Sequence, residues 1–416
     1  MATTARKFGV EAFENAFDSA ALPAVTAERK AALERFAETG LPHHKIEAWK
    51  YTSLVHLART AFQPAPANFE LAGDLPERLE GAARVVFVNG RYSEALSDPR
   101  VAGHTSLKFT ASSDAFVLGR EVGDDPMLAL SAALAADGAV LTFSGDQPPV
   151  ELLYVTVPGA APQMAHTRNR IEVTSGTATV VERHVTVGSG ETTLNNGATQ
   201  IALAEGATFQ HIKLQDEALN ANHIWHHTVG IPAGARYHNY VISVGGGLAR
   251  NRITARLLGE GADCVLDGAY AARGRQHLDH TSLIDHAVAD CTSRQVYKGV
   301  IDNEARGVFQ GHIIVREDAQ RTDGHQLNRA LMLSDKAEID SKPMLEIYAD
   351  DVKCSHGATA GDLDEDHVFY LQSRGIPAPE ARQLLVEAFL AETLEAVPFE
   401  PAREAAIALI QEHLAR

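Results

Sequence analysis

Residues 205–209 read EGATF, and related motifs recur as PAGARY at 232–237, EGADC at 260–264 and AVADC at 287–291. The alanines of these motifs are separated by 28, 27 and 27 residues: Ala207, Ala235, Ala262 and Ala289. Two positions after each alanine lies a second column of larger or sulfur-containing side chains: Phe209, Tyr237, Cys264 and Cys291. Repeats of this length, built from short strands and turns, predict a solenoid in which like residues stack on like residues.

The strand-and-turn pattern extends from about residue 150 to residue 350. Beyond residue 300 the acidic turns are closer together, at intervals of 16, 17 and 16 residues: Asp302, Asp318, Asp335 and Asp351. Stacked coils would lie about 4.8 Å apart, which is the usual spacing between strands. A β-sandwich made of hairpins is the alternative, but the regular repeat favours the solenoid.

Helical patterns flank the repeats on both sides. Thr26 is expected to cap a helix in TAERKAALERFAETGLP (26–42), which Gly40 ends, and Asp364 is expected to cap another, which Gly375 ends. Two further amphipathic segments follow at 377–397 and 400–416, the first with an apolar stripe through Leu384, Leu385, Ala388 and Phe389. We therefore expect a mainly β protein with a helical N-terminal domain (1–105), a β-helix core (106–345) and a helical C-terminal domain (346–416).

Composition excludes several classes of function. The 416 residues are 45% apolar and 22% charged, as in ordinary globular proteins, and they carry a formal charge of −17. This charge argues against a nucleic-acid partner, because phosphate binding needs clustered Lys and Arg. No stretch of about 18 residues is apolar enough to cross a membrane. The first residues lack a signal-peptide pattern, and three cysteines cannot form a disulfide framework, so we expect a cytoplasmic protein.

Several catalytic and binding motifs are missing. The chain has no G-x-x-x-x-G-K-[ST], so we expect no ATP hydrolysis by this chain alone, and it has no G-x-S-x-G, H-E-x-x-H or C-x-x-C. The segment 275–291 contains four potential metal ligands: His277, His280, His286 and Cys291. On a strand, residues three apart point to opposite faces, so we interpret these side chains as core or surface residues. Cys264 and Cys291 are interpreted as buried core residues.

The segment KCSHGAT (353–359) is different. In an extended strand Cys354 and His356 point to the same face with their Cα atoms about 6.5–7 Å apart, so both could bind one metal ion. They could also form a thiolate–imidazole pair, or simply pack. A closed metal or cluster site generally needs four ligands, and the other two cysteines lie 63 and 90 residues upstream. We therefore expect no tightly bound cluster on the isolated chain, and consider a site completed by another subunit.

The segment DVKCSHGATAGDLDEDHVFYLQSRGI (351–376) closely resembles the signature of the SufD family of the SUF iron–sulfur cluster assembly system. The preceding block from QVYKGVIDN to EIYADD (295–351) and the early KIEAWKYTSL (45–54) are also similar to this family. The resemblance covers essentially the whole chain and is strongest from about residue 290 to residue 376. The paralogous SufB family shares the solenoid and the tail, but KCSHGAT and the early Trp-Lys-Tyr-Thr resemble SufD.

This resemblance implies a right-handed parallel β-helix, a heterodimer with SufB through the β-helix cores, and a SufC ATPase docked on the C-terminal helical domain. It also implies a role in iron acquisition, and a transient iron ion or iron–sulfur cluster shared with SufB at the subunit interface. The family's interface histidine corresponds to His356, and the neighbouring cysteine to Cys354. Apolar and aromatic residues of the C-terminal helices are the candidates for contact with SufC: Phe369, Tyr370, Leu384, Leu385 and Phe389.

The resemblance thus favours a non-catalytic assembly scaffold. A free-standing enzyme on a β-helix, such as a polysaccharide lyase, is the alternative, but here the acidic residues lie in turns at the repeat spacing, where they serve turn formation. The stripe through Leu384, Leu385 and Phe389 could equally lie inside a small helical bundle. The exposed sheet edges could also pair two copies of the isolated chain as a homodimer.

Overall fold

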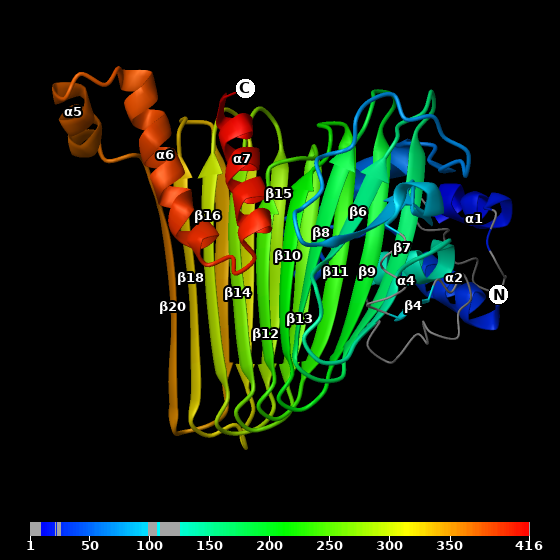
Figure 1. The fold of residues 1–416 in the computed structure, drawn as a ribbon, viewed down its shortest axis with the longest axis horizontal. Coiled ribbons are helices and arrows are strands. Elements are labelled where there is room, and N and C mark those ends of the chain that lie inside the picture. Colours follow the sequence, from blue (N-terminus) through cyan, green and yellow to red (C-terminus); the bar gives the residue numbers. More distant parts are fainter. Residues whose placement is uncertain (1–9, 21, 23–25, 99–105, 109–124, 416) are drawn as a thin grey trace.

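The computed structural model describes residues 10–20, 22, 26–98, 106–108 and 125–415. Two large sheets face each other, and from β5 onward successive strands of the chain alternate between them (Figure 1). The first sheet contains β1 (Gln63–Pro64), β4 (Ser106–Lys108), β5 (Val140–Phe143), β7 (Gln163–Val173), β9 (Thr193–Leu203), β11 (Ala221–Ile231), β13 (Leu248–Leu257), β15 (His277–His286), β17 (Arg306–Val315) and β19 (Glu338–Ile347). The second contains β2 (Ala83–Val88), β3 (Arg91–Tyr92), β6 (Val150–Thr156), β8 (Thr177–Thr186), β10 (Thr208–Asp216), β12 (Arg236–Ser243), β14 (Asp263–Ala272), β16 (Thr292–Ile301), β18 (Thr322–Met332) and β20 (Val352–Gly361).

From β5 and β6 onward, each strand pairs in parallel with the strand two places later in the chain. The chain therefore winds as a parallel β-solenoid, which confirms the predicted fold class. The last coil, β19 and β20, ends at Gly361, beyond the core boundary predicted at residue 345. The first long strand of the second sheet, β2, lies within the predicted helical N-terminal domain and pairs with β6.

The predicted columns are only partly correct. Phe209 pairs with Tyr237, and Tyr237 pairs with Cys264, as expected, but Cys264 pairs with Ser293 rather than Cys291. The reason is the turn before each strand. Two positions before β10, β12, β14 and β16, one residue adopts a left-handed backbone, namely Gly206, Gly234, Gly261 and Asp290, and Arg321 does so directly before β18. Asp290 thus takes the position of a glycine, because aspartate tolerates this conformation. Cys291 then takes the position of the alanine that follows the glycine in the earlier turns.

The N-terminal segments cover the outer face of the first sheet. Helices α1 (Val10–Ser19), α2 (Ala27–Thr39) and α4 (Pro126–Leu134) form an apolar cluster with outward-facing strand residues: Met164, Leu194, Ala198, Ile224 and Leu248. The Thr26 hydroxyl accepts a hydrogen bond from the Arg29 backbone N–H at 3.3 Å, and Gly40 ends α2 with φ 70°, as predicted. The 3-10 helix η1 (Glu47–Trp49) places the Trp49 ring 4.1 Å from the Arg250 guanidinium of β13.

The C-terminal helices α6 (Ala378–Glu395) and α7 (Glu400–Ala415) cover the outer face of the second sheet, whereas α5 (Glu365–Ser373) projects away from it (Figure 1). The Asp364 cap and the Gly375 stop of α5 are confirmed. The predicted stripe of α6 is displaced, since the buried side chains are Ala381, Val386, Leu390, Thr393 and Leu394. Leu384 is 42% exposed instead. None of the helices in the described ranges combines the length and apolar character needed to cross a membrane.

Candidate functional site

The solenoid ends in two open edges. Strands β19 and β20 are the last members of their sheets, and each pairs with only one neighbouring strand of the described chain, β17 and β18 respectively. One side of each strand therefore carries backbone N–H and C=O groups with no strand beside them. Such an edge can accept a strand from another chain.

KCSHGAT lies on β20, so the predicted candidates are at this edge. Cys354 pairs with Gly324 and His356 with Gln326. Through the register of the sheet, Cys354 continues the inward column of Phe209 and Tyr237, and His356 continues an inward column of polar and apolar residues: His211, Asn239, Leu266, Gln295 and Gln326. The structure thus places the two side chains on one face, as predicted, and directs them toward the space between the sheets.

The two side chains differ in burial. Cys354 is half-buried against the core, and burial raises the pKa of its thiol, whereas His356 is exposed. Gly324, opposite Cys354, leaves room for the thiol: a Cβ atom there would lie 3.6 Å from Cys354 Sγ and 3.7 Å from His286 Nε2. At this edge Cys354 and His356 offer two donors from one strand, and no group of three or more converging ligands occurs here among the described residues, so a closed metal site is not complete.

The four potential ligands in segment 275–291 do not converge. His277 faces outward and its Nε2 lies 2.9 Å from the Thr52 hydroxyl, whereas His280 and His286 face inward from the same strand. Cys291 lies in the turn before β16, where its thiol donates to the Gly259 carbonyl at 3.3 Å. The prediction of core and surface residues here is confirmed.

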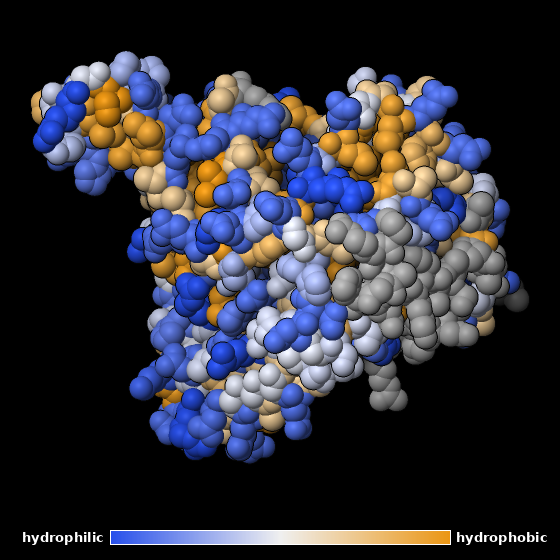
Figure 2. All heavy atoms as spheres, viewed as in Figure 1, coloured by the Kyte–Doolittle hydropathy of each residue, from blue (hydrophilic) through white to orange (hydrophobic). Residues whose placement is uncertain are grey.

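The candidates on the C-terminal helices fall into two groups. Phe369, Tyr370 and Leu384 are 70%, 56% and 42% exposed. Figure 2 shows apolar atoms gathered on the projecting helix α5. In contrast, Leu385 and Phe389 are partly buried against the sheet, and the Lys298 ammonium lies 4.9 Å from the Phe389 ring.

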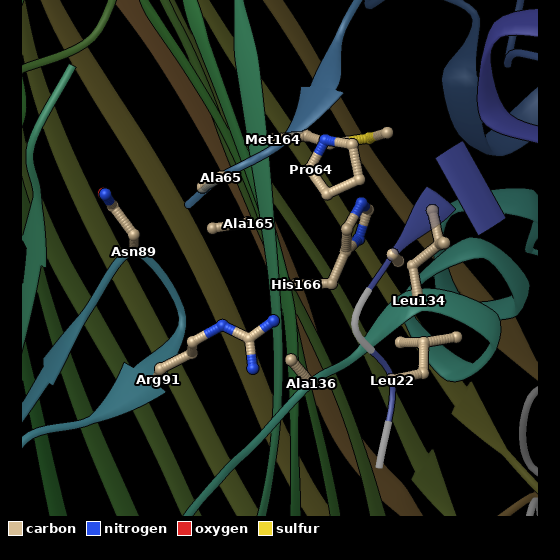
Figure 3. Close-up of a pocket in the computed structure, with 11 residues that line it drawn as sticks. Leu22, Pro64, Ala65, Asn89, Arg91, Leu134, Ala136, Met164, Ala165 and His166 are labelled. Atoms are coloured by element: carbon tan, nitrogen blue, oxygen red, sulfur yellow. The ribbon is translucent and has the colours of Figure 1, made fainter. Parts of the chain in front are cut away.

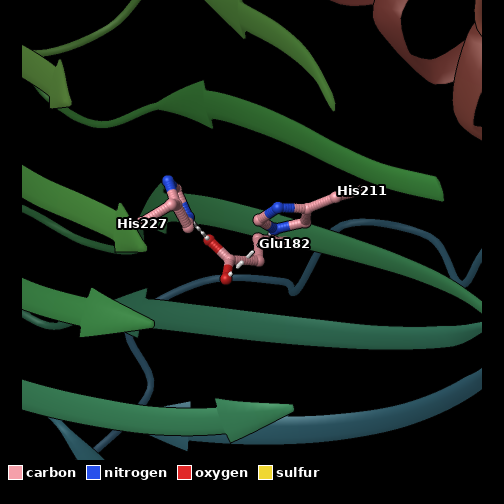
Figure 4. Close-up of side chains that lie close together, drawn as sticks. All are labelled: Glu182, His211 and His227. Atoms are coloured by element: carbon pink, nitrogen blue, oxygen red, sulfur yellow. Dashed lines mark hydrogen bonds and ion pairs between the residues drawn. The ribbon is translucent and has the colours of Figure 1, made fainter. Parts of the chain in front are cut away.

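A polar cluster in the solenoid interior was not predicted from the sequence. Glu182 of β8, His211 of β10 and His227 of β11 are fully buried between the sheets (Figure 4). His227 Nε2 lies 3.2 Å from one carboxylate oxygen of Glu182, and His211 Nε2 lies 3.4 Å from the other. Their separations of 29 and 16 residues match no metal motif, and only the strand register could have indicated that they meet.

The interior environment sets the charges of these groups. Burial lowers the pKa of His227 and of the adjacent His184 to about 3, so both imidazoles are neutral at pH 7. Burial opposes ionisation of Glu182, but His227 and His211 outweigh it and hold the pKa of the carboxyl well below its usual range. Burial also lowers the pKa of Lys213, whose ammonium lies 2.8 Å from His223 Nε2, to about 7.

The described surface has hollows of different sizes. The pocket in Figure 3, lined by Pro64, Met164 and His166 among others, has a volume of about 30 Å³, which is enough for about one water molecule. A larger groove of about 690 Å³ lies between η1, α4 and the outer face of β9, β11 and β13. In that groove the charged side chains of Arg252 and Asp125 pair with each other at 2.5 Å.

The chain is similar to proteins of a known family over most of its length. Residues 155–389 match the SUF system FeS cluster assembly SufBD core domain, and residues 10–77 match the SufBD protein N-terminal region. The iron-sulfur cluster assembly protein SufD of Escherichia coli is 33% identical over 395 residues, covering 92% of this chain and 91% of that protein. A SufBD family protein of Synechocystis is 31% identical, covering 89% and 87%, and one of Mycobacterium tuberculosis is 28% identical, covering 90% and 89%.

The chain therefore belongs to the SufBD family of SUF-system iron–sulfur cluster assembly proteins. Within this family it is a SufD-type protein, since a SufD aligns with it over nearly the full length of both chains.

Proposed function

We propose that this chain is the non-catalytic scaffold subunit of a cytoplasmic SUF complex. In this proposal it pairs with SufB through its solenoid edge, docks the SufC ATPase on its C-terminal helices, and takes part in iron acquisition. His356, with Cys354 beside it, is a ligand for the iron ion or nascent cluster, which is the cargo of the complex. The observation that carries the proposal is the position of both donors on β20, at the open end of the solenoid.

The edge supports pairing with another β-solenoid. Both sheets end at the same coil, so a partner with parallel strands could extend each of them by backbone hydrogen bonds. The inward side chains of this coil are only partly covered, including Ile339 and Leu345 of β19. A second solenoid would bury these side chains, and this burial would contribute to the stability of the pair.

The ligand count supports a shared site. Cys354 and His356 can supply one sulfur and one nitrogen, and a cluster or iron ion requires further ligands. A partner solenoid paired with β20 would bring its own inward side chains next to His356. Imidazole is a suitable ligand for iron. Burial raises the pKa of the Cys354 thiol, so the thiol is neutral in the isolated chain and is a weaker ligand than a thiolate. An iron ion or cluster bound by these two groups would therefore be held loosely enough to be released.

The projecting helix supports a second contact. Phe369 and Tyr370 lie on α5, away from the sheets, and exposed aromatic side chains are typical anchors of protein–protein interfaces. Helices α6 and α7 cover the outer face of the second sheet, whereas α5 extends beyond β20 (Figure 1). This leaves the aromatic side chains of α5 available to a partner.

Co-expression with SufB and SufC, followed by size-exclusion chromatography, tests the proposal. The chain is expected to elute with both partners. Ala358→Pro, which removes a backbone donor from the side of β20 that faces away from β18, is expected to weaken pairing with SufB and not with SufC. An Ala358→Ser variant keeps the donor and serves as the control. Elution of the wild-type chain alone under all conditions would contradict the proposal.

A further inference from the structure

The cluster of Glu182, His211 and His227 has the donor set of a transition-metal site. Two imidazoles and one carboxylate are a common ligand set for Zn²⁺ and Fe²⁺. Potential ligand atoms of the three residues all lie within 4.8 Å of one another, and no other such group of three occurs in the described residues. All three side chains have 0% exposure, so this group is unlike the scattered acidic residues of a surface.

The distances within the cluster suit ligands of one ion and are longer than those of strong hydrogen bonds, although His227 Nε2 and Glu182 do form a hydrogen bond. Two atoms that each lie about 2.1 Å from one ion, at tetrahedral angles, are about 3.4 Å apart. The nitrogen–oxygen distances from Glu182 are 3.2 Å to His227 and 3.4 Å to His211, whereas charge-assisted hydrogen bonds are usually about 2.7–2.9 Å long.

An unpartnered donor points into the cluster. His211 Nε2 is buried and makes no hydrogen bond within the described chain, although it faces the Glu182 carboxylate. His184 Nε2 is also buried without a hydrogen bond there, 3.5 Å from the other carboxylate oxygen. A buried polar atom without a partner is costly, and coordination of an ion would satisfy it.

Neighbouring residues hold the ligands in place. The Thr199 hydroxyl accepts from Trp225 Nε1 and from Asn169 Nδ2, both at 3.1 Å, so its own proton is directed to Glu182 at 3.1 Å. The other ring nitrogen of His211, Nδ1, lies 3.0 Å from the Tyr237 hydroxyl. Residues that orient ligands through hydrogen bonds are typical of metal centres.

The lysine beside Glu182 in the sheet leaves the carboxylate available. Lys213 pairs with Glu182 in the strand register, but its ammonium lies 2.8 Å from His223 Nε2. Glu182 therefore contacts imidazoles and the Thr199 hydroxyl. An ion here would join strands β8 and β10 of one sheet to β11 of the other.

We propose that Glu182, His211 and His227 form a buried binding site for one divalent first-row transition metal ion of the Zn²⁺ and Fe²⁺ class. This site is separate from the proposed cargo site, because β10 and β20 are five strand spacings apart, or about 24 Å. It belongs to the single chain and requires no partner subunit.

Zn²⁺ is a suitable probe, because it has no redox chemistry. The full chain, carrying Cys354→Ser and His356→Ala to remove the edge donors, is unfolded in denaturant with chelator and refolded with or without Zn²⁺. Metal content is then measured after gel filtration. The expected result is one Zn²⁺ per chain and a melting temperature that rises with Zn²⁺. Refolding in this way gives the ion access to a site that is closed in the native chain.

Substitutions locate the ion. Glu182→Gln and His227→Gln are expected to weaken Zn²⁺ binding at least tenfold, whereas His280→Phe, at a buried histidine outside the cluster, is expected to leave it unchanged. Refolding with Co²⁺ adds a test that needs no variant, since bound Co²⁺ with nitrogen and oxygen ligands absorbs visible light. A refolded chain without stoichiometric metal, or Glu182→Gln with full metal content, would overturn the proposal. Neither result would affect the proposed pairing with SufB.

Discussion

His356 lies directly opposite Gln326 in the pairing of β18 with β20, and it is the exposed last member of the inward column that includes buried His211. The column position that is buried in the earlier coils is therefore exposed in the last coil. In the proposed complex, the next coil beyond His356 would belong to the partner solenoid. Its role can be tested separately from its contribution to folding, because it is exposed.

His356→Ala is expected to leave the complex with SufB and SufC intact and to lower cluster assembly by roughly 10–100-fold, the loss typical when a metal site is disturbed. The measurement is the formation of the cluster's visible absorption in the purified complex. His325→Ala is the matched control, since His325 is exposed on β18 but faces outward, bonded to Ser355 and Asp323. Equal assembly by the wild type and His356→Ala would remove His356 from the site.

Phe369→Ala and Tyr370→Ala are expected to weaken the binding of SufC, each by about 2 kcal/mol if the side chain is an interface anchor. The affinity can be measured by calorimetry with purified SufC. Leu219→Ala is the control, because Leu219 is 62% exposed but lies in the turn between β10 and β11 rather than on α5. If Leu219→Ala and the two aromatic variants bind SufC equally well, α5 is not the docking helix.

The stability of the fold is expected to fall between pH 7 and pH 5, with His280 as one cause. Burial lowers the pKa of His280 to about 4, whereas the unfolded chain has the ordinary value of about 6.5. Between these values the unfolded state binds a proton that the folded state does not, so a fall in pH favours unfolding, by about 2 kcal/mol over this range. His280→Phe, between the rings of Tyr270 and Tyr297, should reduce the pH dependence of the unfolding free energy by this amount.

Denaturant unfolding of wild type and His280→Phe at the two pH values measures this difference. His280→Gln removes the same imidazole but keeps a polar side chain, so it should reduce the pH dependence by a similar amount. An unchanged pH dependence in His280→Phe would show that this imidazole binds protons equally in the folded and the unfolded chain.

In two places a tyrosine ring packs over a glycine of the adjacent coil. Tyr270 pairs with Gly299, and Tyr297 pairs with Gly268, across β14 and β16. A Cβ atom at Gly299 would lie 2.2 Å from the Tyr270 ring, so Gly299→Ala is expected to destabilise the fold by about 1–3 kcal/mol, as overpacking does. Gly361→Ala is the control, because a Cβ atom there meets nothing within 4 Å. Equal melting temperatures would show that the tyrosine ring can move aside.

The solenoid could be predicted from sequence because its turns repeat a glycine and an alanine at nearly constant spacing. The register failed at Ala289-Asp290-Cys291, which reads like Ala262-Asp263-Cys264 but occupies the positions of Glu260, Gly261 and Ala262. Aspartate can adopt the glycine's backbone conformation, so two segments with similar sequences occupy different positions in their coils there. Backbone geometry, rather than residue type, decides which side chains stack.

The edge pair could be predicted because two residues apart on one strand share a face, whatever the fold. The interior cluster could not, because its three residues come from three strands and meet only through the register and the distance between the sheets. The stripe of α6 was displaced for another reason. That helix faces a sheet on one side, and Leu384 turns away from it while Val386 and Leu390 are covered.

Because Cys354 and His356 lie in the last coil, at an uncovered end of the solenoid, a metal cargo of the proposed complex could enter and leave without local unfolding of the chain. A second solenoid bound at this end would shield the thiol and the imidazole from solvent at the interface. A small rigid-body rotation that opens the interface would expose both side chains again, while the strand pairing within each solenoid stays intact.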